Sequence, residues 1–168
     1  EDTIILAKMP PQPLPKSMAG PGLLAHILVS KFDDHLPLYR QSEMWERLGV
    51  DLDRTTMGRW VMGCGELLMP LVDLMKQDIV ASGSVQADET GVQVMNEKGR
   101  KNKSKSYMWV FKTAGDENSK IVYHYSPTRN SDVISWFLSG FEGYLQSDGY
   151  RGYTKFAVES PHNIINLG

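Results

Sequence analysis

Two aspartates, Asp88 and Asp148, are the residues in this sequence best suited to chemistry. Asp88 lies in the strand-like run Ser-Val-Gln-Ala-Asp-Glu-Thr-Gly-Val-Gln-Val at 84–94, and Asp148 lies in Leu-Gln-Ser-Asp-Gly-Tyr-Arg-Gly-Tyr at 145–153. Small or polar residues flank both aspartates, where a buried strand would carry valine or isoleucine. Two carboxylates held close together repel each other unless a proton or a cation lies between them.

A divalent cation between these carboxylates would give the pair a function. Mg²⁺ or Mn²⁺ suits an incomplete protein site, because these ions prefer oxygen ligands and Mg²⁺ keeps several waters and accepts substrate phosphates. Two such ions about 4 Å apart would activate a water or hydroxyl and stabilise the leaving oxygen in phosphodiester chemistry. A structural role stays open as the alternative, since Asp148-Gly149 is a common turn pair and Asp88-Glu89 fits a solvent-facing strand edge.

The elements that must position both aspartates follow from hydrophobic periodicity and turn residues. The sequence predicts three strands joined as an antiparallel meander, followed by helix, strand, helix and strand. The expected strands are 85–94, 107–113, 121–125, 143–147 and 163–167, and the expected helices are 132–141, capped by Ser131, and 150–158. The fold class is therefore α/β with a mixed sheet.

This order predicts that the two aspartates meet. A strand reached through a helical crossover pairs in parallel beside a strand that is already present. If the strand at 143–147 lies beside the strand at 85–94, at the usual spacing of about 4.8 Å, then Asp88 and Asp148 lie on adjacent strands and can face each other.

The first half of the chain predicts a spacer and a helical segment. Residues 9–22 hold five prolines, which fix φ and remove donors, so we expect an extended linker over 1–21. Helical periodicity then starts at Leu23, resumes after Pro37, and resumes again after Asp53, a predicted N-cap preceded by the staple residue Leu52. The third helix is expected to run to Ile79, with a kink or a split at Pro70.

The helical segment, 22–83, has two possible roles. Two helices joined at 49–51 resemble a helix-turn-helix, whose second helix could enter a DNA groove with Arg54 and Arg59. The region is net acidic, with 11 acidic and 8 basic residues over 1–84, which favours a packing or dimer-forming helical hairpin instead.

Composition limits the remaining function classes. No apolar run is long enough to span a membrane and no signal peptide is visible, so a cytoplasmic protein without membrane contact is expected. Cys64 is the one cysteine, so a disulfide framework and a cysteine zinc site are excluded, and we expect a packed thiol. With a net charge of −2, any contact with a polyanion must be made by a local patch.

One basic cluster provides such a patch. It consists of Lys98, Arg100, Lys101, Lys103 and Lys105 in the first expected hairpin, next to the strand that carries Asp88. These side chains could contact a DNA backbone or simply be solvated. Arg129 and Arg151 could each meet a phosphate near the metal ions or pair with an acidic neighbour. Glu89 could support the metal ligands from behind, and Trp109, Phe111, Trp136 and Phe137 are expected in the core.

Five separated blocks of the chain form a recognisable set. The blocks are Pro-Gly-Leu-Leu-Ala-His-Ile-Leu-Val-Ser-Lys at 21–31, His-Leu-Pro-Leu-Tyr-Arg-Gln at 35–41, Ala-Asp-Glu-Thr at 87–90, Tyr-Ser-Pro-Thr-Arg at 125–129 and Gly-Tyr-Leu-Gln-Ser-Asp-Gly-Tyr at 143–150. Together they resemble the central part of DDE-type bacterial transposases of the insertion-sequence 66 family. The resemblance implies a ribonuclease-H-like catalytic core with two aspartates and a glutamate. Asp88 would be the first acid and Asp148 the second, both acting as catalytic residues and Mg²⁺ ligands.

The resemblance also predicts what this chain lacks. The family's third acid lies on a helix after the fifth strand, where this sequence ends, and the upstream zinc-binding region is absent. Glu142 and Glu159, the late glutamates, fall at the wrong place in the strand order to substitute. We therefore expect a C-terminally truncated fragment that binds metal weakly and is inactive alone, with 84–168 forming a partial catalytic domain.

The function implied by the resemblance is DNA transposition. The intact enzyme would cut transposon-end DNA and join it to target DNA, a form of DNA recombination, as a homo-oligomer with two metal ions. One alternative is a non-catalytic DNA-binding or assembly remnant of a decayed insertion element. A second alternative is another ribonuclease-H-like integrase or nuclease.

Overall fold

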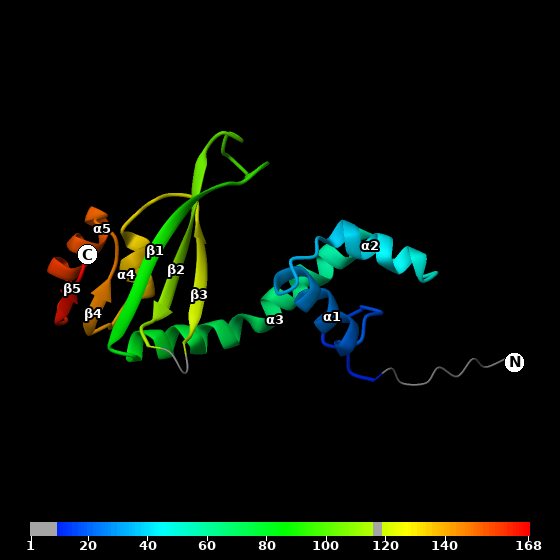
Figure 1. Cartoon of the computed structure of the whole chain (residues 1–168), viewed down its shortest axis with the longest axis horizontal. Coiled ribbons are helices and arrows are strands. Elements are labelled where there is room, and N and C mark those ends of the chain that lie inside the picture. Colours follow the sequence, from blue (N-terminus) through cyan, green and yellow to red (C-terminus); the bar gives the residue numbers. More distant parts are fainter. Residues whose placement is uncertain (1–9, 116–118) are drawn as a thin grey trace, which may run out of the picture. The chain divides into compact units, whose positions relative to one another are not determined.

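The computed structural model describes residues 10–115 and 119–168, so the first nine residues of the expected linker lie outside the described residues. The contacts divide the chain into two compact units, one ending at Pro70 and the other beginning at Leu71. This boundary lies inside a helix, earlier than the expected one at 83/84, because the last turns of that helix pack against the sheet. Figure 1 shows the elements with their labels.

The first unit consists of α1 (Pro21–Phe32), α2 (Leu38–Arg47) and the first part of α3 (Arg54–Ala81). Its core is formed by Ala19, Leu24, Ile27, Leu52, Met57, Trp60 and Cys64. Cys64 is a buried free thiol, as expected, and burial raises the pKa of this thiol. The end of the proline-rich segment is not a free spacer: it forms no helix or strand before α1, yet Ala19 is fully buried and Leu14 packs against the same core.

Helix α3 is continuous through Pro70, so the split that the sequence allowed does not occur. A proline deletes one backbone hydrogen bond, and the other hydrogen bonds of a 28-residue helix persist around it. Helix α3 begins at the predicted N-cap: Asp53 Oδ1 accepts the backbone N–H groups of Thr55 at 2.7 Å and Thr56 at 3.1 Å. Leu52, the predicted staple residue, is buried.

The Asp53 cap gives a prediction for acid stability. The Thr56 hydroxyl and the two backbone N–H groups lower the pKa of Asp53 from 3.8 to about 2. Because the pKa is lower in the folded state, the stabilisation is complete above about pH 4 and is lost as the pH falls through about 2. Helix content measured by circular dichroism against urea should therefore show less acid destabilisation in Asp53→Asn than in the wild type. Asp51→Asn, which removes a nearby exposed carboxylate, is the control and should retain the wild-type acid response; equal acid responses in the two variants would contradict the cap.

The second unit is a five-stranded mixed sheet in the order β3-β2-β1-β4-β5. Its strands are β1 (Ser84–Gln93), β2 (Lys105–Thr113), β3 (Ile121–Ser126), β4 (Gly143–Gln146) and β5 (Ile164–Asn166). The meander β1-β2-β3 is antiparallel, β4 is parallel to β1, and β5 is parallel to β4. Every strand agrees with its sequence prediction to within about two residues at each end.

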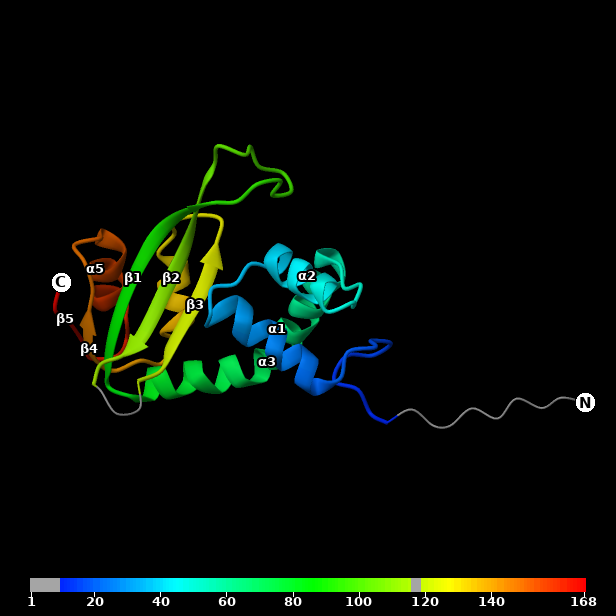
Figure 2. The ribbon, with the colours of Figure 1, turned by 45° about the vertical axis from the view of Figure 1, so that its right-hand side comes forward.

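Helices cover one face of this sheet. Helices α4 (Asp132–Phe137) and α5 (Arg151–Glu159) lie on the same face, as Figures 1 and 2 show. The core there contains Ile79 from α3, Val85, Ala87, Trp109, Phe111, Val122, Leu145, and Ile134, Phe137, Leu138, Phe141, Tyr153 and Phe156 from the segments that cover the sheet. Three of the four aromatic residues predicted for the core are buried. Trp136 was predicted wrongly: it is half exposed, with Lys76 Nζ 3.7 Å above its ring.

The opposite face of the sheet is open among the residues that the structure describes. Ile121, Tyr123, Tyr125, Tyr144 and Ile165 are exposed on it. The second unit is therefore a mixed α/β layer with helices on one side. Within the described ranges, no helix is both long and apolar enough to cross a membrane.

Candidate functional site

Asp88 lies in β1, and Asp148 lies just past the end of β4, the parallel neighbour of β1. The register pairs Val85 with Leu145 and Gln86 with Gln146. The Gln86 side-chain amide also donates to Gln146 Oε1 at 2.8 Å, so these side chains meet on one face. Each aspartate lies two residues beyond this pair. The prediction that the fourth strand pairs in parallel beside the first is confirmed.

The two carboxylates have different local settings. Val85 and Ala87 are buried under the helices, so alternation along β1 directs the exposed Asp88 to the open face of the sheet. Asp88 Oδ1 accepts the backbone N–H of Glu89 at 2.8 Å. Asp148 lies in the loop between β4 and α5, where its Oδ1 accepts the backbone N–H of Tyr150 at 3.0 Å.

A buried carboxylate, Glu89, lies directly behind Asp88. Its side chain has 0% exposure, and it points to the helix-covered face because it follows Asp88 along the strand. Glu89 Oε1 accepts Arg129 Nε–H at 2.6 Å and also contacts Arg129 Nη2. Glu89 Oε2 accepts the hydroxyl of the buried Tyr153 at 2.6 Å. Both oxygens of Glu89 are therefore engaged within the protein.

Arg129 continues this network to Asp148. Arg129 Nη2 lies 3.8 Å from Asp148 Oδ2, and the guanidinium lies 4.1 Å from the ring centroid of Tyr150. The Tyr150 hydroxyl donates to the carbonyl oxygen of Arg129 at 3.0 Å. Arg129 lies after β3, as the sequence predicted, and it pairs with Glu89, which is one of the two roles that the sequence left open for it.

The neighbouring acidic groups act on the hydroxyl of Tyr153. Burial raises its pKa most, followed by the hydrogen bond to Glu89 and by the negative charges of Glu89, Asp88 and Asp148. In the same network, the hydrogen bond to Glu89 is the main cause of a raised pKa for Arg129. Tyr153 therefore stays a neutral donor and Arg129 stays a cation.

The donor set fits a hard cation only partly. Asp88 and Asp148 offer carboxylate oxygens, the ligand type that Mg²⁺ and Mn²⁺ prefer. No group of three or more His, Cys, Asp or Glu residues placed to hold a metal ion occurs among residues 10–115 and 119–168. Glu89 is not available as a third ligand because Arg129 and Tyr153 occupy its oxygens.

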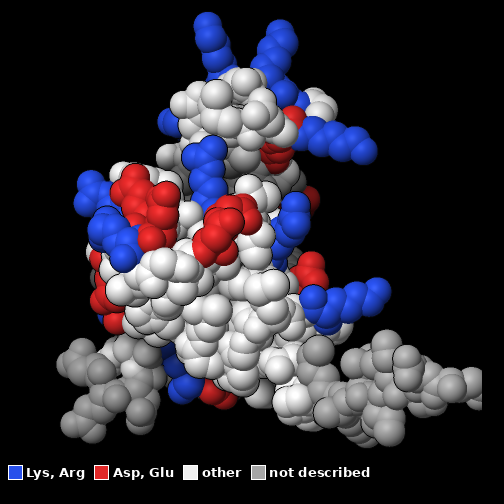
Figure 3. All heavy atoms as spheres, turned by 90° about the vertical axis from the view of Figure 1, so that its right-hand side faces the viewer, with Lys and Arg blue, Asp and Glu red and all other residues white. Residues whose placement is uncertain are grey.

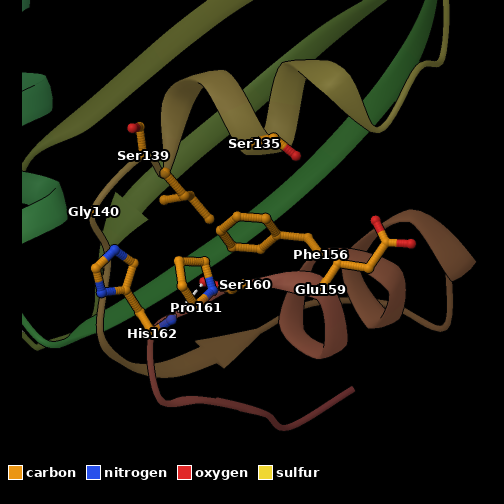
Figure 4. A pocket seen from close by; sticks show the side chains of 9 residues that line it. Ser135, Ser139, Gly140, Phe156, Glu159, Ser160, Pro161 and His162 are labelled. Carbon is orange, nitrogen blue, oxygen red and sulfur yellow. Dashed lines mark hydrogen bonds between the residues drawn. The ribbon is translucent and has the colours of Figure 1, made fainter.

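The two late glutamates, Glu142 and Glu159, each contact another side chain. Glu142 Oε1 lies 2.9 Å from Nδ1 of His162, and Glu159, at the end of α5 remote from Asp148, lies 3.8 Å from Lys155. A pocket of about 310 Å³ lies at the C-terminal ends of α4 and α5, where Figure 4 shows Glu159 and His162 among its lining side chains. It holds none of the predicted site residues, so we place the candidate site at the strand ends.

The basic cluster lies on the β1–β2 hairpin, as predicted. Lys98, Lys101 and Lys103 are exposed in the connection between the strands, and Lys105 begins β2. Figure 3 shows Lys and Arg side chains projecting into solvent from the tip of this hairpin. Arg100 differs from the lysines because it donates to Glu97 at 2.7 Å and to Ser106 Oγ at 2.6 Å.

A network around Glu97 holds the base of this hairpin. Glu97 accepts the hydroxyls of Tyr125, from β3, and Ser106, from β2. The pKa of Glu97 is lowered, first by the Tyr125 hydrogen bond and then by Arg100. Glu97 was not among the predicted site residues, since an acidic residue among lysines fits a solvated turn equally well.

The remaining basic residues of the prediction lie on helices. Arg54 and Arg59 are exposed on the first two turns of α3, and Arg151 is the exposed first residue of α5. None of the three forms an ion pair with another described residue. Arg151 follows Asp148 closely, whereas Arg54 and Arg59 belong to the other unit.

The comparisons with known proteins agree on one family. The model of the transposase IS66 family matches residues 16–166. Two relatives from Sinorhizobium fredii, the uncharacterized proteins y4qI and y4jD, are 32% and 33% identical over 161 and 162 residues, or 93% and 94% of this chain. The chain spans only 30% and 32% of their lengths. No solved structure matches it. With most of its length matched by the family model, the chain belongs to the IS66 transposase family.

Proposed function

We propose that this chain supplies two metal ligands, Asp88 and Asp148, to a transposase that cuts transposon-end DNA and joins it to target DNA. The observation that carries the proposal is the register of β1 and β4, with the Gln86–Gln146 hydrogen bond two residues before each aspartate. Asp88 in β1 and Asp148 just past the end of the parallel strand β4 offer carboxylate oxygens to metal ions, and a metal-bound pair of this kind suits phosphodiester chemistry. The strand order fits a ribonuclease-H-like catalytic layer.

The bound metal ions would polarise a phosphate and activate a water or hydroxyl. The residues of this chain would do two other things. Asp88 and Asp148 would hold the Mg²⁺ or Mn²⁺ ions through carboxylate oxygens. Lys98, Lys101 and Lys103 would contact the DNA backbone, and such phosphate contacts fix position without reading sequence. The third ligand, target DNA and further copies of the chain would complete the active assembly.

A second function is favoured by one observation. Because no third carboxylate joins Asp88 and Asp148 among the described residues, the chain could bind DNA or assemble without catalysing a reaction. In that case the hairpin lysines and the helical unit would act, Asp148 would be a turn residue, and Asp88 would be an exposed residue of the central strand β1. Metal binding separates the two functions.

We expect the wild-type chain to bind Mn²⁺ weakly and Asp88→Asn to lower that affinity by more than about 10-fold, since loss of even a supporting residue costs that much at metal sites. Asp148→Asn should have the same effect. The measurement is a Mn²⁺ titration followed by electron paramagnetic resonance of the free ion. The isosteric amide keeps the size of the side chain and removes only its charge.

Glu159→Gln is the matched control, because it removes one exposed carboxylate from the same unit at the far end of α5. It should leave the Mn²⁺ affinity unchanged. Equal affinities for the wild type, Asp88→Asn and Asp148→Asn would remove the metal site and leave the non-catalytic function.

A further inference from the structure

The network behind the two aspartates joins three segments that are far apart in the sequence. Glu89 belongs to β1, Arg129 to the loop after β3, and Tyr150 and Tyr153 to the segment after Asp148. Four contacts connect them: Arg129 with Glu89, Tyr153 with Glu89, Tyr150 with the Arg129 carbonyl, and the Arg129 guanidinium with the Tyr150 ring. The segment that begins at Asp148 is thereby connected to Glu89 of β1 in two ways, directly through Tyr153 and indirectly through Tyr150 and Arg129.

Glu89 is the centre of this network because it is fully buried. A buried carboxylate costs free energy unless it is paired and hydrogen-bonded, and Glu89 meets both conditions through a cation and a hydroxyl. Arginine suits this position since its planar group can contact a carboxylate with two nitrogens while it stacks on a tyrosine ring. Lysine has one point of charge and could not make both contacts.

The direct contact between Arg129 and Asp148 is the weakest one in the network. At 3.8 Å and half exposed to solvent, it adds little by itself. The backbone of the loop is held more firmly, through Tyr150 stacked against Arg129 and through Tyr153 hydrogen-bonded to Glu89. The network therefore acts on where the Asp148 loop lies rather than on the charge of Asp148.

We propose that Glu89 and Arg129 are positioning residues that hold the loop 147–150 against β1 and so fix Asp148 relative to Asp88. Glu89 and Arg129 hold Asp148 in place relative to Asp88 before any metal ion binds. Arg129 then pairs with Glu89 of the same chain and does not contact a phosphate. The consequence for metal binding rests on the proposed function, whereas the positioning of the loop does not.

The first test measures the loop in the metal-free full chain by hydrogen–deuterium exchange. Glu89→Gln keeps the size of the side chain and weakens its hold on Arg129, and Arg129→Lys keeps the charge and loses the two-nitrogen contact. In both variants we expect exchange of the segment 147–153 to be about 10-fold faster, as for the loss of one charge-assisted hydrogen bond. Lys155→Gln, on the exposed side of α5, is the control and should exchange like the wild type.

Unchanged exchange in folded Arg129→Lys would overturn the proposal. This variant is the decisive one because Arg129 is partly exposed and its replacement leaves no cavity in the core. Circular dichroism and urea unfolding verify that each variant is folded. If Glu89→Gln does not fold, Tyr153→Phe, which removes the other contact of Glu89, takes its place with the same expected exchange.

The second test measures consequences that a merely structural role would not produce. Arg129→Lys should lower Mn²⁺ affinity about 10- to 100-fold, although its charge is unchanged. Arg129→Gln should leave the salt dependence of DNA binding as in the wild type. Tighter Mn²⁺ binding by Arg129→Gln would identify Arg129 as a competing cation. A slope of log K for DNA binding against log salt that is smaller by about 1 would identify Arg129 as a phosphate contact. Either result would overturn the proposal.

The positioning role and the proposed function can fail separately. A wild-type chain that binds no Mn²⁺ would count against the proposed function, and faster exchange in the Glu89 and Arg129 variants would still support the positioning role. Unchanged exchange with wild-type Mn²⁺ binding would retain the proposed function and remove the positioning role.

Discussion

Replacing Gly143 with alanine is expected to lower the free energy of unfolding of the second unit by about 2–4 kcal/mol and to loosen β4 from β1. Gly143 has φ of 126°, a conformation that other residues rarely adopt. A Cβ atom there would lie 2.1 Å from the carbonyl oxygen of Gly83, which accepts the backbone N–H of Tyr144 at 2.9 Å. Backbone strain of about 1–3 kcal/mol and the loss of this hydrogen bond therefore add together.

Gly140→Ala separates the two contributions. Gly140 also has a positive φ, 80°, but a Cβ atom there would meet nothing within 4 Å. Gly140→Ala should lower the free energy of unfolding only by the backbone strain. Gly143→Ala should therefore be the less stable variant in urea unfolding. Hydrogen exchange of residues 143–146 should also rise in Gly143→Ala alone. Equal stability losses in the two variants would show that the contact with Gly83 does not matter.

Much of the sheet could be predicted because its signals are local. Each strand is an apolar or alternating run bounded by turn residues, and the crossover rule then leaves few places for the fourth strand. The confirmed pairing of Val85 with Leu145 puts Asp88 in β1 and Asp148 just past the end of β4, the neighbouring strand. Helical spacing predicted α3 and its cap at Asp53 equally well.

The contacts behind the site could not be read from the sequence. Glu89 shares a strand face with Val85 and Ala87, but its burial was not predicted, and its partners Arg129 and Tyr153 lie 40 and 64 residues away. Such pairings depend on tertiary geometry, which no local pattern encodes. Arg100 illustrates the same limit: it looked equivalent to its lysine neighbours, yet Glu97 and Ser106 hold its side chain.

Neutralising the three exposed hairpin lysines, Lys98, Lys101 and Lys103, to glutamine is expected to lower the salt dependence of DNA binding by about 3 units of slope. Each lysine that neutralises a phosphate releases condensed counterions and contributes about 0.9 to the slope of log K against log salt. The measurement is the affinity for a nonspecific DNA duplex at several salt concentrations. The affinity itself should fall most at low salt, where counterion release is most favourable.

The structure makes this hairpin the best candidate for a backbone contact because its base is ordered while its tip is exposed. Glu97 joins Arg100 to Tyr125 of β3, so less conformational entropy is lost when the lysines meet DNA. A variant with Lys31, Lys120 and Lys155 changed to glutamine carries the same net charge and should keep the wild-type slope. A slope reduced equally in both triple variants would mean that DNA responds to the overall charge of the protein and that the hairpin makes no specific contact with phosphates.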